Sequence, residues 1–243
     1  MQGNRIDLHI EEAGCLIWLA PRSLGGLSPA ALARVWEGQG DESVASLVLR
    51  GAMMPMALYQ DDGYTVRFVV GDLTPQEDAE WVARVDWKLH VPCGEVLVSG
   101  ILTPDFEREF AEIVPAEPGG SYWAGAYVRV PPGDYRVEVL SYPPGDLSSA
   151  WGVMTNPRTF GRHPTIRAEK PLDYFSRTRP GETPPAWITD APDDGPLFVD
   201  MIVRLTPLTE EPPAPQFEDD TCLQWTFRKP ERCPVGIRST IES

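Results

Sequence analysis

Alternation of apolar and polar residues dominates the first 142 positions and predicts β-strands. In residues 5–10, apolar Ile6, Leu8 and Ile10 alternate with polar neighbours, which is the period of a strand with one buried face. The same alternation, or a short continuous apolar run, predicts further strands at 15–20, 43–50, 64–70, 81–91, 95–101, 122–130, 135–142, 197–205 and 223–228.

Helix signals occur in two places. Ser28 is a good N-cap and Pro29 suits the first helical position, ahead of apolar residues at helical spacing. A second helix is expected to open at Thr103 and Pro104. Its buried face would consist of Phe106, Phe110 and Ile113.

Two Pro-Gly turns interrupt the alternating runs and resemble each other. VPCGEVLV at 91–98 and VPPGDYRV at 130–137 align at an offset of 39 residues. A turn of this kind between alternating runs predicts a β-hairpin. We therefore expect two hairpins, 81–101 and 122–142.

Many short strands and few helices predict an all-β protein, an antiparallel β-sandwich with one or two short helices. The sandwich domain is expected to span 1–206. It would hold a long irregular, Pro- and Gly-rich insertion at about 146–196. Residues 207–243 are expected to form an acidic, Pro-rich linker and C-terminal tail.

Charge narrows the class of partner. The 243 residues carry a formal net charge of −15, and residues 1–120 alone hold 8 Lys and Arg against 19 Asp and Glu. Such a chain lacks the basic footprint of a nucleic-acid binder and is unsuited to an anionic membrane surface. It favours basic partners. With no long apolar run and no secretory signal pattern, we expect a cytoplasmic protein.

The four cysteines form no C-x-x-C pair and are expected to be reduced thiols. A bridge between Cys222 and Cys233 remains an alternative. His90 and Cys93 could begin a zinc site, but no further ligand has suitable spacing. Asp190, Asp193 and Asp194 precede Gly195 without the spacing of a calcium loop and favour a turn. We expect no metal and no cofactor.

Catalytic motifs are missing from the sequence: it has no Walker loop, dinucleotide-binding turn, nucleophile elbow or zinc-protease helix. His163 is the best candidate base by location. A hydrolase would require Asp173 or Asp190 to lie beside it. The simpler prediction is a protein that is not an enzyme.

The order of elements and the run YVRVPPGDYRVEVLSY, followed by a last strand with Val199-Asp200, resemble the competence protein J (ComJ-like) family of small acidic bacterial β-sandwich proteins. The resemblance covers about 5–142 and 197–206. It implies an intracellular protein that binds and inhibits a nuclease and has no catalytic residues. The insertion and the tail are departures from the family pattern.

Two functions follow as hypotheses. The first is a protein-binding module of inhibitor or immunity type, whose acidic face meets a basic partner such as a nuclease or toxin. Its candidate contacts are Asp61, Asp62, Asp72, Glu77, Asp78 and Glu80. The second is a carbohydrate- or small-ligand-binding sandwich, since loop tryptophans can stack on sugar rings. Its candidate residues are Trp123, Trp151, Trp187, Asp193 and Asp194.

Overall fold

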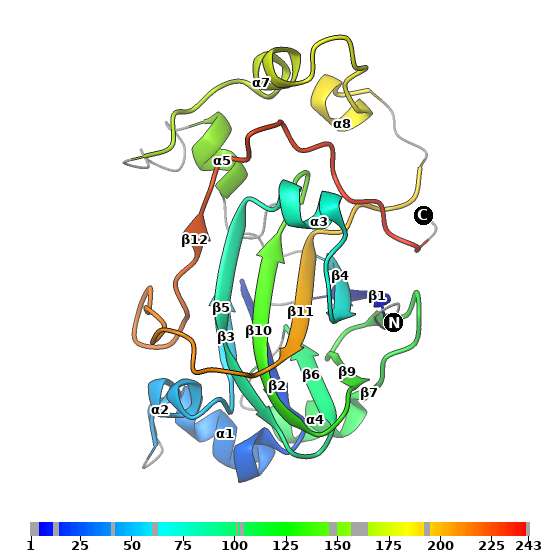
Figure 1. Ribbon diagram of the computed structural model, residues 1–243. Coiled ribbons are helices and arrows are strands. Elements are labelled where there is room, and N and C mark those ends of the chain that lie inside the picture. The colour runs from blue at the N-terminus through cyan, green and yellow to red at the C-terminus, as the bar shows by residue number, and fades with distance from the viewer. Residues whose placement is uncertain are drawn as a thin grey trace.

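Two β-sheets form the body of the protein (Figure 1). The computed structural model describes residues 5–11, 15–39, 42–59, 63–100, 102, 105–145, 150–156, 165–191 and 195–241. The seven-stranded sheet has the order β12 (Thr226–Phe227), β5 (Ala83–Val91), β10 (Gly133–Ser141), β11 (Met201–Pro207), β4 (Gly63–Val70), β1 (Arg5–Glu11) and β8 (Ser121–Tyr122). The five-stranded sheet has the order β3 (Met54–Ala57), β2 (Leu16–Pro21), β6 (Glu95–Ser99), β9 (Ala126–Arg129) and β7 (Val114–Pro115).

Short helices connect the strands and are more numerous than the one or two expected. They are η1 (Leu24–Gly26), α1 (Pro29–Trp36), α2 (Val44–Leu49), α3 (Pro75–Glu80), α4 (Phe106–Glu112), α5 (Ala150–Thr155), α7 (Pro171–Thr178) and α8 (Ala186–Thr189). Ser28 caps α1 as predicted, because its hydroxyl accepts a hydrogen bond from the Ala31 N–H at 3.2 Å. The start expected for the second helix, Thr103-Pro104, lies outside the described residues.

The strand-rich class is confirmed, but the sheets are mixed rather than antiparallel. β11 runs parallel to β4, β1 parallel to β8, and β7 parallel to β9. Parallel neighbours require a long connection between them. The chain between β4 and β11 supplies this length, because it runs from the end of β4 at Val70 to the start of β11 at Met201 and includes β5 and β10. Alternation along a strand does not show whether its neighbour runs parallel or antiparallel, so the sequence pattern could not predict the parallel pairs.

The strand predicted at 43–50 is wrong, because this segment is helix α2. Ser43 caps the helix by accepting a hydrogen bond from the Ser46 N–H at 3.2 Å. Val44, Leu47 and Val48 are buried, and their i, i+3, i+4 spacing is that of one helix face. A short segment in which five of six residues are apolar fits both periods, and here the N-cap favours the helix.

The two predicted hairpins are also wrong, because each Pro-Gly turn carries the chain from one sheet to the other. β5 pairs with β10 and β12, whereas β6 pairs with β2 and β9. The two turns lie side by side, since the Val130 N–H donates to the Gly94 carbonyl at 2.9 Å. The strand predicted at 122–130 is likewise divided into β8 and β9, which belong to different sheets.

The core lies between the sheets, and α1 and α4 cover it at the lower end of the molecule in Figure 1. Trp18 and Phe106 are fully buried and meet edge to face, with ring centroids 5.4 Å apart. The Trp87 indole N–H donates to the Val48 carbonyl at 2.7 Å, which fixes α2 to β5.

No described helix is long and apolar enough to cross a membrane.

The C-terminal segment passes back over the sandwich toward the insertion (Figure 1). β12 pairs with β5 and forms the edge of the seven-stranded sheet, and Phe198 forms an isolated bridge with Arg238. Beyond the sheets, a small apolar cluster joins α7 and α8 to this segment. Its buried members are Tyr174, Phe175, Ile188 and Cys233. All four cysteines are free thiols, so Cys222 and Cys233 are not bridged.

Candidate partner-binding surface

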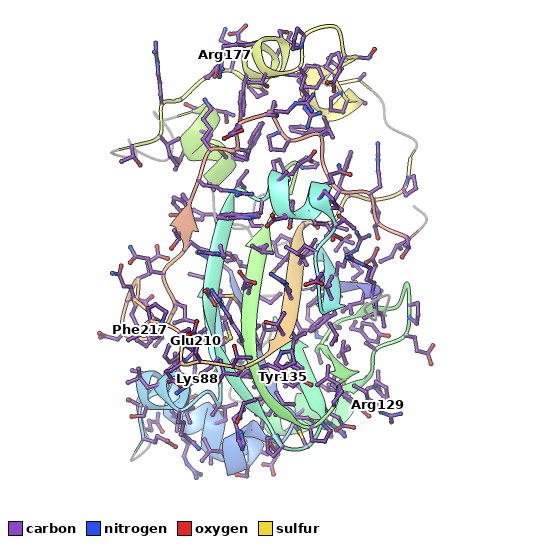
Figure 2. All side chains as sticks on the ribbon, viewed as in Figure 1. Lys88, Arg129, Tyr135, Arg177, Glu210 and Phe217 are labelled. Carbon is purple, nitrogen blue, oxygen red and sulfur yellow. The ribbon has the colours of Figure 1, made fainter. Side chains whose placement is uncertain are left out.

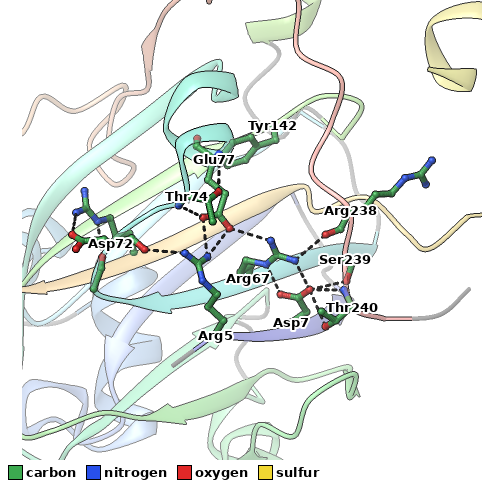
Figure 3. Close-up of polar contacts among 12 residues, drawn as sticks. Arg5, Asp7, Arg67, Asp72, Thr74, Glu77, Tyr142, Arg238, Ser239 and Thr240 are labelled. Carbon is green, nitrogen blue, oxygen red and sulfur yellow. Dashed lines mark hydrogen bonds and ion pairs between the residues drawn. The ribbon is translucent and has the colours of Figure 1, made fainter. Parts of the chain in front are cut away.

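Glu77 belongs to a buried network of charged side chains (Figure 3). Its carboxylate accepts hydrogen bonds from Arg5 at 2.6 and 2.8 Å and from Arg67 at 3.0 Å. It also completes a capping box at the start of α3, where the Thr74 N–H donates to it at 2.7 Å. Burial acts to raise the pKa of Glu77, but these hydrogen bonds outweigh it and hold the pKa below its ordinary value.

Asp7 extends this network to the C-terminal segment (Figure 3). Arg67 donates to both carboxylate oxygens of Asp7 at 2.7 Å, and the Thr240 N–H and Ser239 hydroxyl donate to Oδ2 at 2.7 and 3.0 Å. Burial acts to raise the pKa of Asp7, and the hydrogen bonds from Arg67 and Thr240 together reverse the shift, so the pKa is lowered. Asp7 and Glu77 are therefore charged in the folded protein, and through Arg67 their network joins β1, β4 and the C-terminal segment.

Glu80 holds the C-terminal segment at a second point. Its Oε2 accepts hydrogen bonds from the backbone N–H groups of Val235 and Gly236, both at 3.0 Å, and its Oε1 accepts one from Arg179 at 3.2 Å. Burial raises the pKa of Glu80 despite these donors. Its role is to satisfy backbone groups inside the protein.

These contacts change the predicted partner-binding set. Asp61 and Asp62 lie outside the described residues. Glu77 and Glu80 are 1% and 4% exposed, so a partner cannot reach them. Asp72 and Asp78 face solvent, and Asp72 pairs with Arg204 at 3.3 Å. The described members thus supply two exposed carboxylates.

The three tryptophans proposed for carbohydrate or small-ligand binding lie in two separate places. Trp151 and Trp187 meet edge to face at 5.4 Å, and the Trp187 indole N–H donates to the Val235 carbonyl at 3.0 Å. Both are partly buried against the small cluster around α7. Trp123 is 58% exposed and lies between β8 and β9. Asp193 and Asp194 lie outside the described residues. This pattern favours a structural role for the Trp151–Trp187 pair.

The histidine chemistry considered from the sequence is not assembled in the part of the chain that the structure describes. His163 falls outside it, and Asp173 and Asp190 are exposed. His90 Nδ1 contacts the Asp134 carboxylate, with both side chains more than half exposed. Cys93 Sγ contacts the Glu95 carbonyl at 3.4 Å. Among the described residues, no group of three or more His, Cys, Asp or Glu could hold a metal ion.

A second acidic surface lies in the segment that the sequence pattern predicted to be a linker. Residues 205–227 contain five acids and no Lys or Arg, and Glu218-Asp219-Asp220 is the only run of three acids in the chain. This run forms the tip of a tight turn. Phe217 and Leu223 form a β-bridge, and the Gln224 N–H donates to the Gln216 carbonyl at 2.9 Å. We call residues 216–224 the acidic hairpin.

Asp219 fixes the shape of the tip. Its Oδ1 accepts hydrogen bonds from the backbone N–H groups of Thr221 and Cys222 at 2.7 and 2.6 Å and from the Thr221 hydroxyl at 2.8 Å. Burial acts to raise the pKa of Asp219, but these donors lower it, so the group is a carboxylate at neutral pH. Glu218 and Asp220 are exposed on either side. None of the three pairs with a described cation.

Apolar contacts anchor the hairpin to the sandwich. Leu223 is fully buried, and its N–H donates to the Pro55 carbonyl at 2.8 Å. The Trp225 indole N–H donates to the Ala57 carbonyl at 3.0 Å. Figure 2 shows Phe217 at the outer margin of the molecule. Phe217, Leu223 and Trp225 flanking three acids were the sequence signal for a packed turn in place of a linker.

Comparisons with known proteins give a remote structural likeness. No protein-family model matches the chain, and no curated protein matches it either. The structure described as crocagin biosynthetic gene J is 15% identical, with TM-score 0.44, over 85% of this chain and 99% of that one. The structure of ComJ, inhibitor of the DNA degrading activity of NucA, from Bacillus subtilis, is 8% identical, with TM-score 0.37, over 84% of this chain and 96% of that one. The ComJ match agrees with the weak resemblance seen in the sequence.

Proposed function

We propose that this chain is a non-catalytic protein-binding module of inhibitor type and that the acidic hairpin is its principal contact with a basic partner. The observation that carries the proposal is the fixed backbone of the turn that presents Glu218, Asp219 and Asp220. A turn held by backbone hydrogen bonds and a buried anchor loses little conformational freedom on binding.

Charge supports the choice of partner. A net charge of −15 attracts a basic protein over a distance, and three adjacent carboxylates that pair with no described cation supply the local contact. ComJ is an inhibitor of a DNA-degrading activity, that of NucA. A nuclease suits the same chemistry here, because a cleft that binds phosphate groups must be basic.

Affinity capture with matched charge variants tests the proposal. The full chain is compared with the triple variant Glu218→Gln, Asp219→Asn, Asp220→Asn, in which the amide that replaces the Asp219 carboxylate retains a carbonyl acceptor for the turn. The control is Glu107→Gln, Glu112→Gln, Glu117→Gln, which removes equal charge from exposed positions elsewhere. We expect the full chain and the control to capture a stoichiometric basic protein, released at about 0.5 M salt by screening.

The hairpin variant should capture at least about tenfold less of that protein, because a buried interfacial charge contact contributes about 1.4 kcal/mol or more. The captured protein is then assayed for nuclease activity with and without the chain. Equal capture by the hairpin variant and the control, or a captured partner of acidic charge, would contradict the assignment of the hairpin. A captured basic protein whose activity the chain does not alter would contradict the inhibitor role.

A further inference from the structure

A cavity of about 850 Å³ lies between α3 and the C-terminal segment 228–235. Figure 1 shows this segment passing beside α3. Its wall holds both apolar and charged residues. The apolar part consists of Pro75, Ala79, Pro230 and Val235. A cavity of this size accommodates a small organic molecule.

The charged part of the wall is unusual for so acidic a protein, since it presents four cations. They are Arg179, Arg228, Lys229 and Arg232. Three of them are neutralised: Arg179 by Glu80 at 3.2 Å, Lys229 by Glu169 at 3.0 Å, and Arg232 by Glu182. Within the described residues, Arg228 forms no ion pair with a carboxylate.

Arg228 is nevertheless held in one position. Its Nε donates to the Trp81 carbonyl at 2.9 Å, its Nη2 donates to the Asp78 carbonyl at 2.5 Å, and its guanidinium carbon lies 3.5 Å from the centre of the Trp81 ring. Its Nη1 donates to no described acceptor. Burial lowers the pKa of Arg228, which remains charged because arginine loses its proton only at very high pH.

We propose that this cavity binds a small amphipathic anion, whose carboxylate or phosphate group pairs with Arg228 while its apolar part contacts Pro75, Ala79 and Pro230. A guanidinium that is fixed, partly desolvated and without a carboxylate partner is preorganised for an oxyanion. The site is separate from the acidic hairpin and uses none of its residues.

Asp78 and Glu231 oppose this binding, since both carboxylates line the cavity and are exposed. Glu80 also lines it, but it is occupied by two backbone N–H groups and Arg179. The Asp78 carboxylate interacts electrostatically with Arg228, so removing its charge should strengthen anion binding. This gives a variant with an effect opposite to the loss of Arg228.

The test is an NMR titration of the full chain with phenyl phosphate and with benzoate, and with benzyl alcohol as the neutral probe. We expect both anions to shift the Trp81 indole resonance and the amides of Ala79 and Val235, with benzyl alcohol binding at least about tenfold more weakly. The stronger of the two anions identifies the oxyanion. Shifts confined to other regions, or equal binding of benzyl alcohol, would overturn the proposal on the unaltered protein.

Variants then test whether Arg228 is the group that binds the anion. Arg228→Gln should weaken binding of the better anion at least about tenfold, and Arg228→Lys less so, because Lys retains charge without the planar fork. Asp78→Asn should strengthen binding about twofold or more. Arg129→Gln, an equal charge change at an exposed position on β9, should leave affinity within about twofold. If Arg228→Gln does not fold, an Asp78→Asn affinity no higher than that of the unaltered chain overturns the proposal.

Discussion

Asp7 and Arg67 lie directly opposite each other on β1 and β4 and form a double hydrogen bond, with both N···O distances 2.7 Å. The pair is nearly closed to solvent, since the Asp7 side chain is 2% and the Arg67 side chain 11% exposed. A cross-strand pair on a sheet face is thus also the attachment point of the C-terminal segment, through Ser239 and Thr240.

Asp7→Asn should therefore destabilise the fold by about 3 kcal/mol, because the buried Arg67 loses one of its two carboxylate partners and keeps only Glu77. Urea unfolding followed by tryptophan fluorescence measures this change. Asp72→Asn is the matched control: Asp72 pairs with Arg204 at 3.3 Å, but its side chain is 98% exposed. The control should change stability by less than about 1 kcal/mol. Equal effects of the two substitutions would show that burial of the Asp7 pair is unimportant.

The pH dependence of stability follows from the same network. The pKa values of Asp7 and Glu77 are lower in the folded chain than their ordinary values of 3.8 and 4.5. The unfolded chain therefore binds more protons near these values, so this stability is complete above the ordinary pKa values and is lost as the pH falls through the folded ones. Glu80, with a raised pKa, acts in the opposite direction: it favours folding below its ordinary pKa and loses that contribution as the pH rises.

We expect the urea concentration at the unfolding midpoint to decrease as the pH is lowered from about 5 to about 3. The decrease should be smaller in Asp7→Asn. The variant has lost one of the carboxylates whose protonation differs between the folded and unfolded chains. Parallel pH profiles for the two proteins would argue against Asp7 as a source of the dependence.

The two Pro-Gly turns offer a paired test of backbone geometry. Gly94 has φ +69°, and a Cβ at this position would lie 2.8 Å from the Val130 carbonyl oxygen. Gly133, its counterpart in the sequence repeat, has no atom within 4 Å of such a Cβ. Gly94→Ala should cost about 2 kcal/mol or more, whereas Gly133→Ala should change stability by less than about 1 kcal/mol. Thermal unfolding of both variants distinguishes the positions, and similar losses would refute the crowded turn at Gly94.

The cysteines should differ sharply in reactivity. Burial raises the pKa of Cys222 to about 11 and that of Cys233 to about 12, so both are protonated thiols. Cys93 is exposed. Iodoacetamide at about pH 8, followed by mass spectrometry, should label Cys93 and leave Cys222 and Cys233 unmodified until urea is added. Rapid labelling of the buried pair in the folded protein would contradict their packing.

Local signals in the sequence determined most of the elements. The Ser28 cap and the alternation in β1, β5 and β10 depend on residues within a few positions, and the predicted helix and strands are present. The partners of those strands are not local. A Pro-Gly turn reverses the chain equally well within one sheet or between two, so the turn at Gly94 could not reveal that β5 pairs with β10.

The candidate site was harder to predict for a related reason. Charged residues are usually exposed, which made Glu77 and Glu80 candidates for a surface. Their burial depends on donors distant in sequence: Arg5 lies 72 positions from Glu77, and Val235 lies 155 positions from Glu80. The acidic hairpin was the opposite error. Its proline and acid content predicted an extended linker, although Leu223 is buried and anchors the segment to the sandwich.

The bonds from Ser239 and Thr240 to Asp7 span 232 and 233 positions. Translation makes β1 well before the donors that complete the Asp7 carboxylate. A nascent chain that pairs β1 with β4 early therefore leaves Asp7 partly unsatisfied until residues 239 and 240 have emerged. A chain cut short before residue 239 would hold an incomplete charge network, and its lower stability would expose it to cellular quality control.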